Sequence, residues 1–389
     1  MILTIDRNTF IWVKNKEGYV YNTSNYQSFK FSCDKHINHV IKLLNRPESL
    51  YMVDLGKINN SDSLNDWVNN IIQIDSGRLF KDMADAIPSM KPILKIENDR
   101  IRILKRKDFL EMINCVSEIT IHLNGSPIRE EEYNLHKQYP YPTNSTQYID
   151  FKSVLSFINQ FPETITLKLI ADFSSYPDFF QLISALKKRK NKTFLYTRIE
   201  DLTHVEEEKR KLLNDFNVTI LCRINYDLDN YIKFTKSYFG SALYTFICFN
   251  KTDFVQIENI ETQNINYSIV ALYNGKNIDF LQEYVFLSKQ EIESQKLEKR
   301  NIFINQTLNG FFFGKLIVFP DGSVQANANT GKIGHIGNKL ISLLRLLLQK
   351  KSIWFNTRNC VPCNRCIYQW VCPPISNYEL TIGKTNLCY

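Results

Sequence analysis

The spacing of apolar and polar positions changes within the first 90 residues. Short runs of β-type residues, separated by polar turns, come first. Apolar residues then recur at helical spacing over 37–44 behind a Ser32 cap, and again over 62–74 behind Ser61. This pattern predicts a small α+β domain over residues 1–90. Its three predicted strands are 9–13, 19–22 and 28–31.

The pattern alternates more regularly in the middle of the chain. Two short apolar runs around 97–100 predict a hairpin within 91–107, and strand-like runs then alternate with amphipathic helical stretches as far as residue 287. Strands separated by helices imply parallel pairing through right-handed crossovers. Six such units fit a partial barrel over 91–287, and a doubly wound open sheet fits almost as well. The predicted strands are 118–123, 164–170, 193–198, 218–223, 243–249 and 267–272, and the predicted helices are 151–160, 176–188, 205–216, 229–238, 251–257 and 277–284.

Residues 288–389 form a third predicted unit. A charged linking helix over 288–309 opens with a Ser288 cap. A second helix, over 339–350, is apolar nearly all round, which indicates burial between this unit and a neighbour. A surface for an obligate partner is the alternative interpretation of that apolar excess.

Composition narrows the class of protein. The 389 residues are 44% hydrophobic and 13% aromatic, enough to bury substantial cores in two or three domains. The net charge of +8 is mild for this length, and the basic run 187–190 falls at a predicted helix end, where cations complement the helix dipole. We therefore expect no nucleic-acid partner. No apolar stretch approaches the ~18–20 residues of a membrane span, so we expect a cytoplasmic protein without a membrane partner.

The cysteines are unevenly distributed. Nine occur in the chain, and five of them lie in the last thirty residues. A C-x2-C turn aims two thiolates at one centre, and two later cysteines complete four ligands, which suit Zn²⁺ or an iron–sulfur cluster about equally. Disulfides are not expected, because nothing in the sequence indicates secretion. The four candidate ligands are Cys363, Cys366, Cys372 and Cys388, and Cys360 has no evident role.

The order C-x2-C-x5-C followed by a distant cysteine resembles the SPASM domain of radical-SAM peptide-modifying enzymes. That resemblance implies that Cys363, Cys366, Cys372 and Cys388 hold one auxiliary [4Fe-4S] cluster, with Zn²⁺ as the alternative. Residues 319–327 resemble the hairpin that opens this domain. At the positions where the family has cysteines for a first auxiliary cluster, this chain has other residues. These are Asn327 and, near the second position, Ser376.

The sequence around the cysteines, 363–379 and 383–388, is similar to one family more closely. It resembles the pseudo-radical-SAM proteins with a SPASM tail that occur in Gly-Gly-type ribosomal-peptide (RiPP) maturation systems of Bacteroidales. Segments 10–12 and 21–23 fit the same family. The resemblance implies an α/β fold: a degenerate radical-SAM-like partial (β/α)6 barrel, preceded by a winged-helix-like α+β domain and followed by a Cys-rich SPASM- or twitch-like domain.

The motif for radical chemistry is missing. The family places three cysteines as C-x3-C-x2-C in the loop after the first barrel strand, but residues 124–142 contain none. No Gly-Gly-Glu run follows the second strand, so no S-adenosylmethionine is expected. The resemblance then implies a non-catalytic partner that forms a heterodimer with a true radical-SAM/SPASM maturase. The alternatives are a zinc-stabilised interaction scaffold and an enzyme with repurposed barrel chemistry. An acid–base pair for the latter would come from residues at strand ends: His122, His136, Asp172 and Glu200.

The first domain carries a second candidate site. Three strands followed by helices resemble the winged-helix element that binds leader peptides in RiPP biosynthesis. In that element the leader adds as an extra strand to the sheet edge. A small domain that packs on its neighbour and binds nothing is the alternative, because this topology carries no signature residue. On the analogy, the helix over 62–74 is one wall, and the docking edge is Ser28, Phe29, Lys30 and Phe31.

Overall fold

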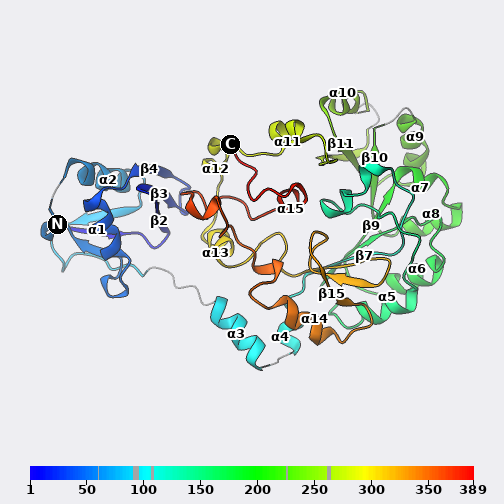
Figure 1. Ribbon diagram of the computed structural model, residues 1–389, viewed down its shortest axis with the longest axis horizontal. Helices are drawn as coiled ribbons and strands as arrows, with labels where there is room; N and C mark the ends of the chain where they lie inside the picture. The colour runs from blue at the N-terminus through cyan, green and yellow to red at the C-terminus, as the bar shows by residue number, and fades with distance from the viewer. Residues whose placement is uncertain (60, 91–95, 107–108, 225–226, 261–263) are drawn as a thin grey trace.

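The computed structural model describes the chain except for residues 60, 91–95, 107–108, 225–226 and 261–263. An N-terminal lobe lies at one end, and a large sheet with its helices lies at the other (Figure 1). The C-terminal segment runs between the two (Figure 1). Within the described ranges, every helix is too short or too polar to cross a bilayer.

The three strands predicted in the N-terminal lobe are confirmed. They form an antiparallel sheet in which β3 (Glu17–Asn22) lies between β2 (Thr9–Lys14) and β4 (Ser28–Ser32). Two helices follow, α1 (Lys35–Leu44) and α2 (Asp62–Gln73). Ser61 caps α2 as predicted. The Ser32 cap is wrong, because the Asp34 carboxylate accepts hydrogen bonds from the first turn of α1 instead.

A second sheet in this lobe was not predicted. Its central strand is β1 (Ile2–Ile5), flanked by β5 (Met52–Asp54) and β6 (Gly77–Phe80), all antiparallel. Leu3 and Ile5 are fully buried against α1 and α2 in one core that also receives Trp67. The winged-helix assignment remains a prediction.

The hairpin predicted within 91–107 is wrong for its described part, and residues 93–95 lie outside the described residues. Residues from Ile96 to Arg106 form helix α3, and α4 (Phe109–Ile113) follows. Ile103 and Leu104 pack against the main core, and the Arg100 guanidinium donates to the carbonyl oxygen of Leu348 at 2.8 Å. These contacts with the C-terminal segment fix the helical register.

The six predicted strands of the middle segment are confirmed, and all of them pair in parallel. They belong to a nine-stranded sheet with the order β12-β11-β10-β9-β8-β7-β13-β14-β15. The last three strands come from the C-terminal segment and extend the sheet beyond β7. The strands are β7 (Glu118–His122), β8 (Thr166–Ile170), β9 (Thr193–Arg198), β10 (Asn217–Arg223), β11 (Leu243–Cys248), β12 (Asn266–Ala271), β13 (Lys315–Val318), β14 (Ser323–Gln325) and β15 (Lys332–His335).

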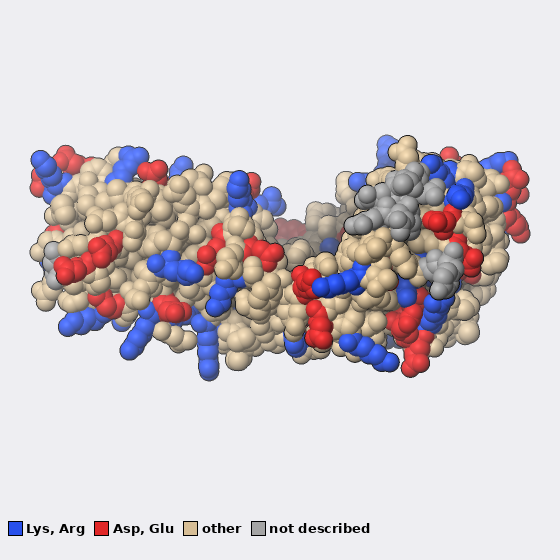
Figure 2. Space-filling view, turned by 90° about the horizontal axis from the view of Figure 1, so that it is seen from above, with Lys and Arg blue, Asp and Glu red and all other residues tan. Residues whose placement is uncertain are grey.

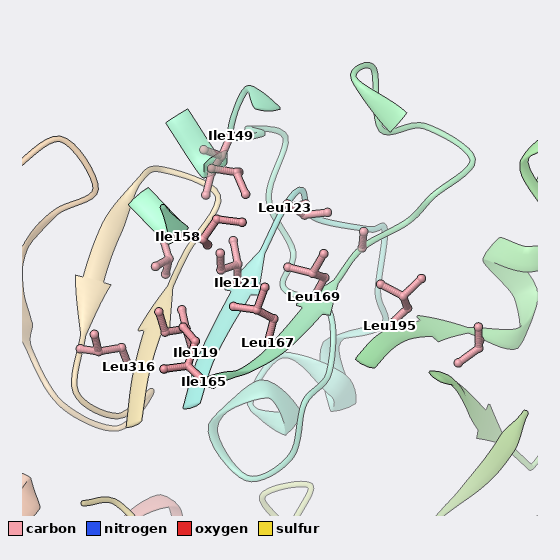
Figure 3. Close-up of a cluster of buried hydrophobic side chains, with 14 of the residues drawn as sticks. Ile119, Ile121, Leu123, Ile149, Ile158, Ile165, Leu167, Leu169, Leu195 and Leu316 are labelled. Carbon is pink, nitrogen blue, oxygen red and sulfur yellow. The ribbon is translucent and has the colours of Figure 1, made fainter. Parts of the chain in front are cut away.

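The helices of the middle segment cover one face of this sheet, which favours the partial barrel over the doubly wound alternative. Outward-facing residues such as Ile121 and Leu169 pack among apolar helix residues such as Ile158 (Figure 3). Their neighbours along the strands, such as Ile170, belong to a separate core on the inner face. The helices are α5 (Phe151–Ile158), α6 (Phe179–Lys187), α7 (Ile199–Thr203), α8 (Glu207–Leu213), α9 (Leu228–Tyr238), α10 (Lys251–Ile260) and α11 (Ile278–Tyr284).

The predicted linking helix is two shorter helices, α12 (Lys289–Glu293) and α13 (Lys299–Thr307). Ser288 caps the first of them in a capping box, as predicted. The apolar helix is α14 (Leu340–Leu347), which buries four leucines in the main core, while α15 (Asn377–Ile382) lies near the C-terminus.

Candidate functional sites

The first candidate site is the inner face of the parallel strands, most of which the chain covers with its own residues. The loop 124–142 after β7 folds inward, so that Leu135 and Tyr141 are buried. They pack against Ile170 and Leu221 from the inner faces of β8 and β10. The loop in which the radical-SAM family has its cysteine motif therefore contributes to the core here.

One glutamine ties this loop to the far edge of the six parallel strands. The Gln138 side chain donates to the carbonyl oxygen of Tyr273 and accepts from its N–H, both at 2.8 Å. Tyr273 lies just beyond β12, whereas Gln138 belongs to the loop after β7. From α15, the Tyr378 hydroxyl donates to the carbonyl oxygen of Ala271 at 2.7 Å. The mouth of the barrel is thus bridged by its own first loop and by the tail.

Two buried ion pairs lie next to the same loop. The Ser126 hydroxyl donates to the Asp201 carboxylate at 3.1 Å, and the Arg198 Nε donates to the same carboxylate at 3.0 Å. Burial raises the pKa of Asp201, and the pairing with Arg198 acts in the opposite direction. Arg223 pairs with Glu132 at 3.0 Å, where the carboxylate is almost fully buried. Ser126 thus joins loop 124–142 to α7, and Glu132 joins it to the end of β10.

The four strand-end residues proposed for acid–base chemistry do not form one site. His122 and His136 meet at 6.4 Å between ring centroids, and His122 stacks on Phe319. Burial lowers the pKa of His122 to about 3 and that of His136 to about 4, so both are neutral near pH 7. Asp172 instead accepts from the Ser174 N–H at 2.9 Å within its own turn. Among the described residues, neither Asp172 nor Glu200 lines the cavity that the histidines share.

The second candidate site is the outer edge of β4. The Asn22 N–H donates to the Gln27 carbonyl oxygen at 2.9 Å, and the Cys33 N–H donates to that of Lys16 at 2.7 Å. Hydrogen-bonded pairs alternate in an antiparallel ladder. The residues whose backbone N–H and C=O groups point toward β3 are therefore Gln27, Phe29, Phe31 and Cys33. No strand of the described chain pairs with the other edge. The residues whose backbone N–H and C=O groups point outward are Ser28, Lys30 and Ser32.

The side chains of β4 connect two parts of the molecule. Phe31 packs against Trp67 of α2 at 5.8 Å between ring centroids. On the opposite face, Lys30 forms an ion pair with Glu293 of α12 at 2.9 Å, and Glu293 also accepts a hydrogen bond from Tyr368. The predicted docking edge thus lies beside α2 and is braced by the C-terminal segment.

The third candidate site is the cysteine-rich tail. Cys363 and Cys366 flank a tight turn closed by the Cys366 N–H, which donates to the Cys363 carbonyl oxygen at 3.0 Å. The Cys372 N–H donates to the Tyr368 carbonyl oxygen at 2.9 Å, and the backbone of Cys388 forms an isolated parallel β-bridge with Leu287. All nine cysteines are free thiols.

The four candidate ligands lie in one part of the tail. Burial raises the pKa of the Cys363, Cys366 and Cys372 thiols, that of Cys372 to about 12, and the nearby Cys388 raises all three further. Within the part of the chain that the structure describes, however, no three His, Cys, Asp or Glu side chains are close enough together to hold a metal ion. Four thiols as donors still suit Zn²⁺ or a [4Fe-4S] cluster.

Sequence reasoning missed the buried ion pair beside these cysteines. Arg358 and Glu379 are 6% and 2% exposed and pair through two contacts, at 2.7 and 3.2 Å. The Arg358 guanidinium also lies 3.7 Å from the Cys363 sulfur and donates to the carbonyl oxygen of Pro373. The Ser-x-x-Glu spacing from Ser376 to Glu379 signals a helix start, but nothing in the sequence marks Arg358 as its partner.

The two positions where the SPASM resemblance expects further cysteines have structural roles here. Asn327 is 3% exposed, and its side chain accepts from the Asn329 N–H and donates to Asn377. Ser376 is the N-cap of α15. Both side chains therefore satisfy backbone or amide groups of the tail.

The basic run at 187–190 begins at the last residue of helix α6, and Lys187 pairs with Asp215 in the turn after α8. On the face seen in Figure 2, basic and acidic side chains are interspersed, and the surface is hollowed between the N-terminal lobe and the barrel. The pairing of Lys187 with Asp215 agrees with a solvated helix end rather than a one-signed patch.

No protein-family model and no curated protein matches the chain. Among solved structures, two that match are of SuiB from Streptococcus suis, one bound to S-adenosylmethionine and one bound to the precursor peptide SuiA. They are 12% and 10% identical in sequence, each with a TM-score of 0.48 over 99% of this chain and 97% of the SuiB chain. We base no conclusion on a similarity of this extent.

Proposed function

We propose that this protein binds the leader of a ribosomally made precursor peptide at the outer edge of β4 and presents it to a radical-SAM maturase. The unpaired edge of β4 carries the proposal. Lys30 and its neighbours Ser28 and Ser32 offer backbone donors and acceptors in the spacing that an added strand needs. Helix α2, which packs against β4 through the contact of Trp67 with Phe31, would be the second wall.

The filled barrel supports a non-catalytic role in this pairing. Loop 124–142 contains no cysteine, and it buries Leu135 and Tyr141 where a reactive cofactor would need space. The bridge from Gln138 to Tyr273 would have to break before a substrate could enter the mouth. The proposed function is therefore to bind the peptide and the maturase, and the radical reaction belongs to the maturase.

The tail would hold one [4Fe-4S] cluster, or Zn²⁺ as the alternative, through Cys363, Cys366, Cys372 and Cys388. Such a group supplies structural support or electron transfer, because four thiolates leave no open position for a substrate. The position of Arg358, 3.7 Å from the Cys363 sulfur, supports this, since its positive charge opposes the effect of burial, which raises the pKa of that thiol.

The metal is tested by iron, acid-labile sulfide and zinc analysis after anaerobic purification. Cys363→Ala is compared with Cys115→Ala, a cysteine outside the tail. About four iron and four sulfide per chain, lost only in Cys363→Ala, would support the cluster. One zinc without sulfide would favour the structural alternative. A metal content that Cys363→Ala leaves unchanged would remove the tail site from the proposal.

The peptide site is tested by a matched pair of variants at Lys30. Lys30→Pro removes one outward N–H and obstructs an added strand, although Pro is otherwise tolerated on an edge strand. Lys30→Ala removes the ion pair with Glu293 but keeps the N–H. We expect a Gly-Gly-containing precursor to be encoded beside this gene. The probe is a synthetic peptide with the leader sequence of that precursor, titrated by calorimetry.

We expect the Lys30→Pro variant to bind the leader at least about tenfold more weakly than the Lys30→Ala variant, because an added strand loses a main-chain hydrogen bond and meets the ring. Equal affinity of the two variants would place the peptide elsewhere. Absence of binding to the unmodified protein would remove the leader-binding proposal.

A further inference from the structure

A cavity of about 220 Å³ lies on the inner face of the sheet, away from both β4 and the cysteines. Strands β7, β8 and β13 form one side, and residues 311–312 and 326–328 of the C-terminal segment form the other. Its volume corresponds to about seven water molecules at liquid density. It therefore has room for a small molecule but not for a folded peptide segment.

The charges that line the cavity do not balance. Lys168 of β8 pairs with Glu118 of β7 at 2.8 Å, and both side chains are about one-fifth exposed. Lys315 of β13 lies beside them, and within the described chain its ammonium group has no ion-pair or hydrogen-bond partner of its own. Burial lowers the pKa of Lys315, and Glu118 opposes that shift. One positive charge in the lining therefore remains without a dedicated counter-charge.

Two imidazole rings in the lining each have a buried nitrogen atom without a hydrogen-bond partner among the described residues. The two atoms are the Nδ1 atoms of His122 and His136, and His122 is 2% exposed. The His136 ring also interacts with the Tyr133 backbone, which acts to raise its pKa against the effect of burial. Buried polar atoms are normally paired, so two of them at one cavity indicate a missing partner. A neutral imidazole carries one N–H donor and one acceptor nitrogen, so each ring is able to donate to a ligand oxygen.

We propose that this cavity binds a small carboxylate, with Lys315 as the counter-charge and the imidazoles of His122 and His136 as hydrogen-bond donors. A monoanion matches the single surplus charge, whereas a phosphate dianion would exceed it. The described lining also contains no arginine, the side chain whose planar fork suits phosphate best. The walls that are left, such as Phe312, suit a short apolar or amide-bearing acid.

The test uses the full-length protein labelled with ¹³C at the histidine Cε1 position. Six histidines give few signals, and His122→Phe and His136→Phe assign the two cavity rings. The probes are acetate and its neutral isostere acetamide, with inorganic phosphate as a second anion and chloride to match ionic strength. The variants are Lys315→Met and, as the matched control, Lys332→Met on the exposed first residue of β15.

We expect acetate to shift the His122 and His136 signals saturably, while acetamide and chloride leave them in place. Lys315→Met should weaken acetate binding about tenfold or more, and Lys332→Met should not change it. Unshifted signals from the four histidines outside the cavity in ligand-free Lys315→Met show that the variant is folded. Signals that no probe moves, equal shifts with acetamide, equal binding by Lys315→Met, or a preference for phosphate would each overturn the proposal.

Discussion

Replacing Arg358 by Met should destabilise the cysteine-rich tail strongly. The change leaves the Glu379 carboxylate, 2% exposed, without its bidentate partner. Removing one member of a buried ion pair typically costs about 3–5 kcal/mol, because the remaining charge stays buried and uncompensated. The carbonyl oxygens of Pro373 and Pro374 also lose a donor, so the cost should fall within that range rather than below it.

Hydrogen exchange measures this loss where it occurs. The Cys366 and Cys372 amides are bonded within the tail, and a loss of about 3 kcal/mol corresponds to roughly 150-fold faster exchange. Arg365→Met is the matched control, because Arg365 is exposed and lies in the turn between Cys363 and Cys366. The double variant Arg358→Met/Glu379→Met should recover most of the protection. If the Cys366 and Cys372 amides of Arg358→Met exchange at rates within about threefold of those in Arg365→Met, at equal metal content, the reasoning is refuted.

Three further results are expected. Gln138→Ala removes two hydrogen bonds across the barrel mouth, worth about 2 kcal/mol, so the Tyr139 amide should exchange roughly thirtyfold faster. The exposed Gln147→Ala is the control and should leave that exchange rate unchanged. Equal Tyr139 exchange rates in the two variants would contradict the bridge. Leu344 is fully buried in α14, so Leu344→Ala should lower the free energy of unfolding in urea by about 2–5 kcal/mol. Leu346 is 43% exposed, so Leu346→Ala should lower it by less than about 0.5 kcal/mol. Similar unfolding midpoints for the two variants would contradict the packing. Because the pKa of His122 falls from 6.5 to about 3 on folding, the unfolded chain binds more protons in that window. Stability should therefore fall by up to about 1.4 kcal/mol per pH unit as pH drops through it, and His122→Phe should be less acid-sensitive; equal acid sensitivity would contradict burial of the neutral ring.

The parallel strands were predictable because their signal is local. Each of the six is a short apolar run between amphipathic helices, and burial on both faces keeps the run continuous, as in β10. The choice between a partial barrel and a doubly wound sheet was not local. It depended on which residues of a strand face the helices, as Leu169 and Ile170 do on opposite faces.

The elements that were missed depend on distant partners. Strand β1 has only four residues and gains its neighbours from β5 and β6, more than 45 positions away. Helix α3 was mistaken for a hairpin because its short apolar runs fit either period, and its contact with Leu348 is invisible in sequence. Short segments take the structure that their tertiary contacts stabilise.

The candidate sites show the same division. The cysteine spacing and the β-type run 28–31 were legible as patterns, since a turn and a strand are local. The Gln138 bridge joins residues 135 positions apart. The unpaired Lys315 and the two neutral histidines come from strands and a loop that meet only in the folded sheet. The sequence indicated the two histidines as strand-end residues, but it indicated neither the Gln138 bridge nor the role of Lys315.

The central claim is that this chain contributes binding and no chemistry. It is tested most directly by incubating the proposed precursor peptide, S-adenosylmethionine and a reductant with this protein alone, with only the radical-SAM protein that we expect to be encoded beside it, and with both. The peptide is followed by mass spectrometry. We expect modified peptide only when the radical-SAM protein is present, and faster formation when this protein is added. Modification by this protein alone, or a rate that its addition leaves unchanged, would contradict the account.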